Sequence, residues 1–286
     1  MEPVDIISYL KKNIDSFSKR QKIIGNYLIE NYDKAAYMTA SALSEAVGVS
    51  ESTVVRFAAE IGFSGYPAMQ KSLKQITMTQ STSLKRMEIA SRQFSSSNIL
   101  ESVLKSDIRM IEHTLSEISQ EEFDLAVEAI LKAKNIYITG VRSAASLASF
   151  ADFYFHLMFD NTRLIKSADA ADMFEQVLRI NENDVIIGMS FPRYSKNIIK
   201  LLEYANKKGA TVISITDNKN SPIGRLSHYC LSAGSNMDSF ADSLVAAFSV
   251  VNALITVLSM KHKDVVKESF ETLENIWDEY EVYDKE

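Results

Sequence analysis

The stretch "DVIIGMSFPRYSKNII", residues 184 to 199, decides the fold. Its first half is a short apolar run that predicts a buried strand, and its second half has the spacing of an amphipathic helix. A strand that turns directly into a helix is typical of α/β proteins with a parallel sheet. At such turns a Gly-rich loop often binds an anion at the helix N-terminus, yet this turn contains Pro192, Arg193 and Tyr194. The sequence therefore raises the question of whether the turn binds a ligand.

The same alternation of strands and helices extends through the chain from residue 135. Two amphipathic helical patterns (98–119 and 121–134) precede it, and a long apolar helix to about Met260 follows it. The five runs that predict strands are 135–140, 162–166, 184–190, 210–217 and 228–234. This alternation predicts a three-layer α/β domain, in which helices cover both faces of a five-stranded parallel sheet.

The N-terminal part of the chain has a different pattern. Residues 1–76 carry apolar side chains at three- and four-residue intervals without strand-like alternation, which predicts helices throughout. Residues 77–97 are rich in Ser and Thr, a composition that suits a linker. We therefore expect an all-α domain over 1–76, a linker over 77–97, the α/β domain over 98–262, and a C-terminal helix and tail over 263–286.

Length and composition limit the class of protein. A chain of 286 residues has room for about two domains. Its one cysteine, Cys230, excludes a disulfide framework and favours a reducing compartment. No apolar run reaches the roughly 18 residues of a membrane span, and the N-terminus does not resemble a signal peptide. These features predict a cytoplasmic protein without a membrane partner.

The net charge of −6 is unevenly distributed. Residues 1–80 contain nine Lys/Arg and eight Asp/Glu, a net charge of +1, whereas residues 81–286 contain 22 and 29, a net charge of −7. Acidity argues against a protein that coats nucleic acid, but this distribution leaves room for a near-neutral DNA-binding module on an acidic body. The four histidines show no metal-ligand spacing, so we expect neither a metal nor another cofactor.

Residues 39–63, "TASALSEAVGVSESTVVRFAAEIGF", predict two helices joined by a tight turn. The first helix ends at Gly48, which takes a positive φ at little cost, and Ser50 is placed to cap the second helix, 51–61. This layout is that of a helix-turn-helix, whose second helix presents its N-terminal residues to the major groove. The apolar residues expected to lock the two helices together are Leu43, Val47, Val49, Val54, Val55, Phe57, Ala58 and Ile61.

The candidate DNA contacts lie on the first two turns of that second helix and shortly after the motif. They are Ser50, Ser52, Thr53, Arg56 and Lys71. A guanidinium suits guanine or phosphate, and hydroxyls suit phosphate or flexible base contacts. The alternative is an ordinary αα-hairpin, in which Arg56 and Lys71 are solvated side chains.

Two strand-to-helix turns, "TGVRSAAS" (139–146) and "SFPRYSKN" (190–197), are the candidates for a ligand site. Free backbone N–H groups, serine hydroxyls and a helix dipole favour an anion at each turn. In open α/β sheets such turns lie outside the C-terminal ends of the strands, and the two arginines inside them favour a carboxylate or phosphate ligand. The candidate ligand-binding residues are Arg142, Ser143, Ser190, Arg193, Tyr194, Ser195 and Ser239.

Structural roles remain open for some of these residues. Ser195 has the position of a routine N-cap. The arginines have an alternative role as ion-pair partners of Asp172 or Asp238. Ser239 lies in "SNMDSFADS" (235–243), where N-capping of the following helix is as good an account as ligand contact.

The segment "LSEAVGVSESTVVRFAAEIGFSGYPAMQKSL" (43–73) resembles the N-terminal DNA-binding domain of the RpiR family of bacterial transcriptional regulators. It contains the family's "VS-x-x-TV-x-RF" core at 49–57 and its "GF-x-GY/F" at 62–66. The later part, about 108–262, is similar to the sugar isomerase (SIS) domain that binds phosphosugars in these regulators. The resemblance implies a homodimer or homotetramer that binds double-stranded operator DNA, senses a small anionic sugar derivative and controls carbohydrate-metabolism genes.

The two turns depart from the pattern of the SIS family. Its second loop usually resembles S-x-S-G-x-T and surrounds the phosphate, but here Pro192 replaces the middle serine, Arg193 the glycine, and Ser195 the threonine. In the first loop, a G-x-G-x-S pattern has become "GVRSA" (140–144). Because arginine replaces both glycines that let the backbone approach the anion, the expected ligand is either a sugar phosphate or a sugar acid.

A SIS-type sugar-phosphate isomerase or deaminase is the alternative function. Isomerisation needs a general base such as Glu or His, and Glu175 and His228, the nearest candidates, have no partner visible in the sequence, so no catalytic residue is predicted. A structural dimer with a vestigial pocket is a third reading, which leaves the two arginines unexplained. Among other polar residues, Asp217 is expected to bond its own turn and His156 to pack in the core.

Overall fold

The computed structural model of the chain describes residues 6–80, 98–235 and 241–283. These residues divide into two compact units, Met1–Arg86 and Met87–Glu286. Each unit has its own hydrophobic core, so each is described separately below.

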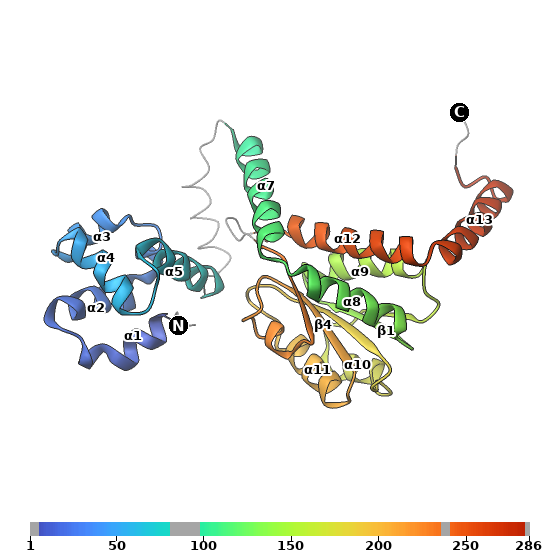
Figure 1. Cartoon of the computed structure of the whole chain (residues 1–286), viewed down its shortest axis with the longest axis horizontal. Helices are drawn as coiled ribbons and strands as arrows, with labels where there is room; N and C mark the ends of the chain where they lie inside the picture. The colour runs from blue at the N-terminus through green and yellow to red at the C-terminus, as the bar shows by residue number, and fades with distance from the viewer. Residues whose placement is uncertain (1–5, 81–97, 236–240, 284–286) are drawn as a thin grey trace. The chain divides into compact units, whose positions relative to one another are not determined.

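The first unit is entirely helical in its described residues, as predicted (Figure 1). Its helices are α1 (Ile6–Asn13), η1 (Ile14–Ser16), α2 (Lys19–Ala35), α3 (Ala40–Val47), α4 (Glu51–Glu60) and α5 (Tyr66–Gln80). Leu28, Leu43 and Phe57 are among the fully buried residues of their shared core. We expected this domain to end at residue 76, but its last helix, α5, continues to Gln80. Thr77 is buried, so this part of the helix still packs against the domain. The remainder of the expected linker, 81–97, lies outside the described residues.

The second unit contains the predicted five-stranded parallel sheet. Its strands are β1 (Ile136–Gly140), β2 (Thr162–Ile165), β3 (Val185–Met189), β4 (Thr211–Thr216) and β5 (Tyr229–Ser232). They are ordered β2-β1-β3-β4-β5, and every neighbouring pair is parallel. Gly140 pairs with Met189, so β1 and β3 end side by side in the middle of the sheet.

Helices cover both faces of this sheet, which confirms the three-layer prediction. The helices of the unit are α7 (Ile99–Glu117), α8 (Gln120–Lys132), α9 (Ala144–Phe155), α10 (Ala170–Gln176), α11 (Lys196–Lys207), η2 (Gly224–Leu226), α12 (Val245–Lys261) and α13 (Lys263–Glu279). Figure 1 shows α8, α9 and α12 on one side of the strands and α10 and α11 on the other. Each face of the sheet has its own hydrophobic core. Because side chains alternate along a strand, Ile136 and Ile138 belong to the core under α8, α9 and α12, and Tyr137 belongs to the core under α10 and α11.

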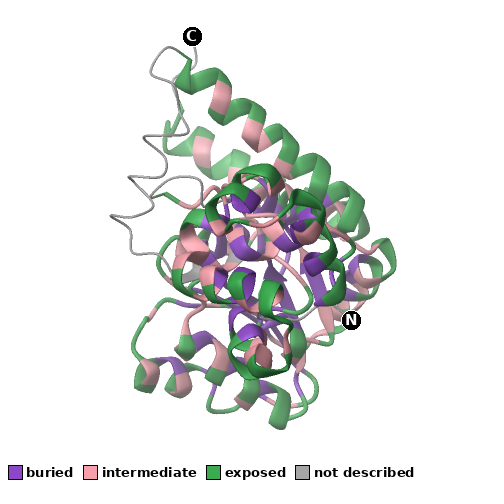
Figure 2. Cartoon of the chain, turned by 90° about the vertical axis from the view of Figure 1, so that its left-hand side faces the viewer, coloured by how far each residue is buried: buried purple, intermediate pink, exposed green. Residues whose placement is uncertain are grey.

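The helices at the two ends of the second unit are more exposed than those on the sheet. α13 contains no buried residue, and Figure 2 shows the helix that leads back from the C-terminus in green and pink. α7 packs against α12 but buries only Thr114. Among the described residues, no single helix is long and apolar enough to cross a membrane; α12 and α13 reach that length and composition only as a pair, with a 95° bend between them.

Candidate functional site

The two arginine-bearing turns lie on either side of the point where the sheet reverses its winding direction. After β1 the chain crosses to β2 on one side, whereas after β3 it crosses to β4 on the other. In open α/β sheets, ligands bind outside the C-terminal ends of the strands at such a switch point. The strand order therefore brings 141–143 and 190–195 together, which the sequence alone did not establish.

Arg142 and Arg193 both have left-handed backbone, with φ of 59° and 70°. The only other described non-glycine residue with positive φ is Glu281. Left-handed backbone costs a residue with a Cβ about 1–2 kcal/mol, and such strain is concentrated at functional sites. Both turns thus keep a conformation that suits glycine while they carry an exposed guanidinium.

Gly140 explains how tightly the first turn is built. A Cβ at this position would lie 2.5 Å from the carbonyl oxygen of Ala144, far inside van der Waals contact. Only glycine therefore lets the end of β1 pass this close to the first turn of α9, two residues before Arg142.

The serines of the second turn bond to one another and to the helix. Ser195 is the N-cap of α11, and its hydroxyl accepts a hydrogen bond from the Ile198 N–H at 3.5 Å. Ser190 is buried, and its hydroxyl accepts from the Ser195 N–H at 3.3 Å. The capping role considered for Ser195 is confirmed, and ligand contact by either serine stays a prediction.

The serines of the first turn are more exposed. Ser143 precedes α9 without a capping bond from its side chain; its hydroxyl donates a long hydrogen bond, 3.5 Å, to Asp242 Oδ2. The Ser146 hydroxyl donates to the Ser143 carbonyl at 2.7 Å. The segment that follows β5 therefore reaches the first turn through Asp242.

Described residues on both sides of 236–240 bond to α7. Gly234 N–H donates to Thr114 Oγ1 at 2.8 Å, and the Ser243 hydroxyl donates to Asp107 Oδ1 at 2.7 Å. Ser239 and Asp238 lie between these anchors but outside the described residues, so neither their ligand role nor the ion-pair alternative for Asp238 is tested. Asp172, the other acidic candidate, accepts a hydrogen bond from the Ser167 hydroxyl at 3.1 Å.

Tyr194 connects the second turn to the end of β4. Its hydroxyl donates to Asp217 Oδ1 at 2.8 Å, and Asp217 also accepts from the Thr216 hydroxyl at 3.1 Å and from the Asn218 amide at 2.7 Å. Burial, followed by the charge of Asp217, raises the pKa of Tyr194, and burial raises the pKa of Asp217. The hydroxyl of Tyr194 thus holds the turn through its bond to Asp217. We did not predict this bond, although Tyr194 and Asp217 follow the neighbouring strands β3 and β4.

The helix-turn-helix of the first unit has the predicted geometry. Gly48 ends α3 with a φ of 68°, and Val49 packs against the core. Ser50 is the N-cap of α4, but its hydroxyl bonds to those of Ser52 (3.0 Å) and Thr53 (2.7 Å) and makes no capping bond. The cap position is confirmed, and the three hydroxyls form one cluster at the start of the second helix.

The outward face of α4 contains the candidate DNA contacts. Ser52 and Arg56 are exposed, and Arg56 Nε lies 3.5 Å from the Ser52 carbonyl oxygen. Our expectation that Val55 locks the two helices together is wrong: it is 42% exposed and lies on this same face, because Val54 takes the buried position one residue earlier. Lys71 is exposed on α5.

The residues considered as general bases lie elsewhere in the second unit. His228 precedes β5, and its Nδ1 accepts a hydrogen bond from the Val212 N–H near the start of β4, at the opposite end of the sheet from the two turns. Glu175 lies at the exposed end of α10. His156 is not in the core, contrary to expectation: it ends α9 with an exposed ring 3.1 Å from Asp152 Oδ1. In the described part of the chain, no cluster of His, Cys, Asp or Glu has the arrangement of a metal site.

Each of the two units matches a known protein family. Residues 4–80 match the family described as "Helix-turn-helix domain, rpiR family", and residues 129–257 match the SIS domain. An uncharacterized HTH-type transcriptional regulator of Clostridium perfringens is 25% identical over 256 residues, 88% of this chain and 89% of that protein.

Solved structures share the fold. The Vibrio vulnificus NanR protein, complexed with ManNAc-6P, has a TM-score of 0.59 and 22% identity, covering 95% of this chain and 99% of its own. The sugar isomerase domain of an RpiR transcription factor from Sphaerobacter thermophilus has a TM-score of 0.58 and 22% identity, covering 61% of this chain and 97% of its own.

Fold and site together define a helix-turn-helix DNA-binding protein with a SIS-type α/β domain. The two matched segments lie in the two separate units, one in each. The chain's domain composition is that of RpiR-type transcriptional regulators: a helix-turn-helix domain of the rpiR family followed by a SIS domain.

Proposed function

We propose that this regulator senses a small anionic sugar derivative, in the first place a sugar phosphate, and thereby controls genes of carbohydrate metabolism. The observation that carries the proposal is the pair of left-handed arginines, Arg142 and Arg193, at the switch point of a SIS-type sheet. The ManNAc-6P bound to V. vulnificus NanR supports a phosphosugar as the ligand class.

The recognition helix in this proposal is α4. Arg56 contacts a guanine or a phosphate, and Ser50, Ser52 and Thr53 supply hydroxyls near its N-terminus. The exposed Val55 adds an apolar contact suited to the methyl group of thymine. Lys71 contacts a backbone phosphate from α5. Because operator DNA is chromosomal, we expect the protein to act in the cytoplasm.

Ligand recognition in this proposal is shared between guanidinium groups and helix N-termini. Arg142 and Arg193 bind the anionic group, which one guanidinium can hold through two parallel hydrogen bonds. The exposed hydroxyl of Ser143 and the segment containing Ser239 contact the sugar. Tyr194 positions Arg193, since its bond to Asp217 fixes the turn. Either phosphate or carboxylate satisfies this arrangement.

We propose that the protein works as a homodimer or homotetramer. On α7, the exposed residues Leu104, Ile108, Ile111 and Leu115 recur at intervals of four, three and four residues. This is the spacing of a helix that packs along a partner helix. A two-fold assembly would read a palindromic operator with half-sites about one DNA turn, or a multiple of it, apart.

The alternative of a sugar-phosphate isomerase or deaminase has little support in the site. The described residues of the two turns include neither Glu nor His, and His228 lies at the other end of the sheet. The proposed activity is therefore binding without turnover, in which the ligand acts through its different affinity for two arrangements of the regulator.

The function is tested with the full-length protein and an operator fragment selected by the protein from genomic DNA. Fluorescence anisotropy is measured with and without a panel of sugar phosphates and sugar acids. We expect one class to change the DNA affinity by about 5- to 150-fold, the range typical of allosteric coupling, while chromatography shows the sugar unchanged. Steady conversion of the sugar, or tight sugar binding without any effect on DNA affinity, contradicts the proposal.

A further inference from the structure

A hollow lies on the face of the sheet that α10 and α11 cover, beside the edge strand β2. Its volume is about 490 Å³, which is large enough for a small metabolite. The hollow is bordered by the end of α10, which is only seven residues long. The residues that line the hollow are Tyr137, Arg163, Ile165, Glu175, Gln176, Leu178 and Arg179.

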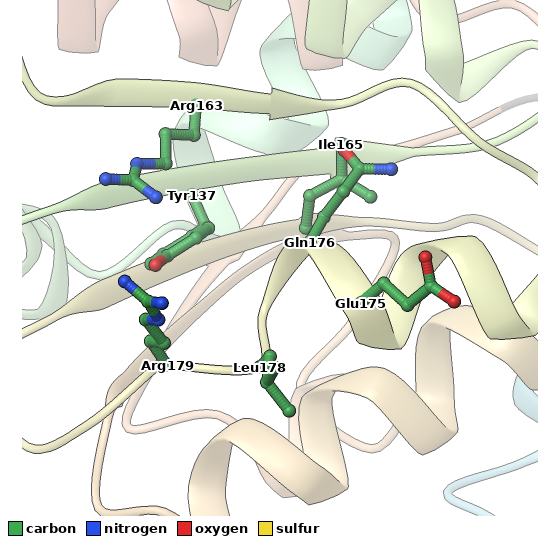
Figure 3. A pocket seen from close by; sticks show the side chains of 7 residues that line it. All are labelled: Tyr137, Arg163, Ile165, Glu175, Gln176, Leu178 and Arg179. Atoms are coloured by element: carbon green, nitrogen blue, oxygen red, sulfur yellow. The ribbon is translucent and has the colours of Figure 1, made fainter.

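Three hydrogen-bond donors meet at one end of this hollow. Figure 3 shows the guanidinium groups of Arg163 and Arg179 approaching the hydroxyl end of Tyr137 from two sides. The Arg163 guanidinium carbon lies 5.7 Å from the centre of the Tyr137 ring. Tyr137 is 2% exposed and forms the floor; burial raises its pKa, so its hydroxyl keeps the proton that it donates.

In the part of the chain that the structure describes, no carboxylate forms an ion pair with Arg163 or Arg179, although the charge of Asp184 reaches Tyr137. Figure 3 shows the carboxylate of Glu175, on the lining helix, directed away from both guanidiniums. The buried Asp184 is held by amide groups: it accepts from Asn135 Nδ2 at 2.7 Å and from the N–H of Asn181 at 2.9 Å. Two guanidiniums outweigh the single negative charge of Asp184, so together with the phenol they attract an anion, which can hydrogen-bond to all three groups.

This hollow is separate from the two turns. Tyr137 is the second residue of β1, whereas Arg142 follows the end of that strand. At about 3.3 Å per residue, three residues of strand separate Tyr137 from Gly140 by roughly 10 Å. Tyr137 also belongs to the core on the α10 and α11 face, while α9, which begins after the first turn, covers the opposite face.

We propose that Arg163, Arg179 and Tyr137 form a second anion site, which binds the phosphate group of a small phosphorylated metabolite or free inorganic phosphate. The phosphate lies between the two guanidiniums. The rest of the hollow, with the Gln176 amide and the apolar side chains of Ile165 and Leu178, takes the body of an ester. Arginine suits this task because its planar fork matches phosphate oxygens in pairs.

The test is isothermal titration calorimetry of the full-length protein with three probes: inorganic phosphate, glucose 6-phosphate and glucose. The Arg142→Ala/Arg193→Ala double variant serves as the parent, so that the two turns do not contribute. In this parent we expect phosphate or the ester to bind and glucose to give no heat. If the ester binds more tightly than inorganic phosphate, the site takes a metabolite; equal affinities identify inorganic phosphate as sufficient.

Variants of the parent then locate the site. Arg163→Ala/Arg179→Ala should weaken binding at least 10-fold, and Tyr137→Phe, which keeps the ring on the floor, should weaken it several-fold. Arg225→Ala removes the same charge from the exposed Arg225 on η2 and should change nothing. Circular dichroism and the Tm check that each variant is folded.

Two results overturn the inference. One is a parent protein that binds neither phosphate nor its ester at millimolar concentration. The other is unchanged affinity in a folded Arg163→Ala/Arg179→Ala protein. Neither result bears on the sensing function proposed above, because that function depends on Arg142 and Arg193 and is measured through DNA affinity.

Discussion

Arg142 and Arg193 adopt the same left-handed backbone conformation at the ends of two directly paired strands, with φ of 59° and 70°. The resemblance of the sequence to SIS domains predicts that each arginine stands in place of a glycine. The turn keeps the glycine-like backbone at an energetic cost, and the side chain adds a positive charge. This combination is explained if the guanidinium is needed for binding.

Arg193→Gly and Arg193→Ala should separate strain from recognition. Glycine relieves the left-handed strain and alanine does not, so we expect the glycine variant to unfold with a free energy about 1 kcal/mol larger than the alanine variant. Both should lose the ligand response of DNA binding, because both lack the guanidinium. Urea denaturation and operator anisotropy measure the two effects; a glycine variant with a normal ligand response would remove Arg193 from the site.

Arg56→Ala should weaken operator binding by about 1–3 kcal/mol, the discrimination supplied by a good base contact, while ligand binding is retained. Arg20→Ala is a matched control, because Arg20 is an exposed arginine on α2 of the same unit. Anisotropy at several salt concentrations distinguishes the two contacts, since loss of a phosphate contact lowers the salt dependence. Equal DNA affinity of the Arg56 variant and wild type would place the recognition surface elsewhere.

Tyr194→Phe should destabilise the second unit by about 1–3 kcal/mol, because it removes one of the two hydrogen bonds that the Asp217 Oδ1 atom accepts and leaves only the bond from the Thr216 hydroxyl. Burial already raises the pKa of Asp217 above its ordinary value of 3.8, and loss of a hydrogen bond that favours the charged form raises it further. A carboxyl with a raised folded-state pKa stabilises the protein at low pH, and this contribution is lost as the pH rises through that pKa.

The cost of Tyr194→Phe should therefore be larger at neutral pH and decrease as the pH falls through the pKa of Asp217. Urea denaturation across this pH range measures the trend. The control compares Asp217→Asn with the Asp217→Asn/Tyr194→Phe double variant. Because the titrating carboxyl is absent from both, the cost of Tyr194→Phe should no longer depend on pH. A cost that is independent of pH would show that the hydrogen bond does not stabilise the charged carboxylate.

Gly140→Ala should destabilise the second unit more than Gly188→Ala does. At Gly140 the new Cβ meets the Ala144 carbonyl at 2.5 Å, which is backbone, whereas at Gly188 it meets side-chain atoms of Leu202 at 2.6 Å. A side chain can move, so we expect about 1 kcal/mol at Gly188 and about 3 kcal/mol at Gly140, within the range for overpacking. Thermal denaturation measures both, and the reverse order would show that the α9 turn can shift.

Leu104→Asn/Ile108→Asn should shift the protein toward smaller assemblies, because both side chains lie on the exposed apolar stripe of α7. Lys105→Asn is the control on a neighbouring position of the same helix, where Lys105 forms an ion pair with Glu101. Sedimentation velocity gives the distribution of species. If the double variant and the control sediment like wild type, α7 is not the contact between subunits.

The sequence by itself determined the features that depend on neighbouring residues. The alternation of apolar runs and helical periods predicted the parallel sheet, and Gly48 with Ser50 predicted the turn between α3 and α4. The two arginine-bearing turns were also visible, because each directly follows a strand. Local pattern is sufficient here, since strand and helix periods arise within a few residues of chain.

Only the tertiary structure decided which residues meet and which face solvent. The bond from Tyr194 to Asp217 joins residues 23 positions apart, and the left-handed backbone of the two arginines is seen only in the folded turns. Val55 proved to be exposed, and Arg163 and Arg179 came together beside Tyr137. These outcomes depend on how whole elements pack against one another, so no local pattern in the sequence contains them.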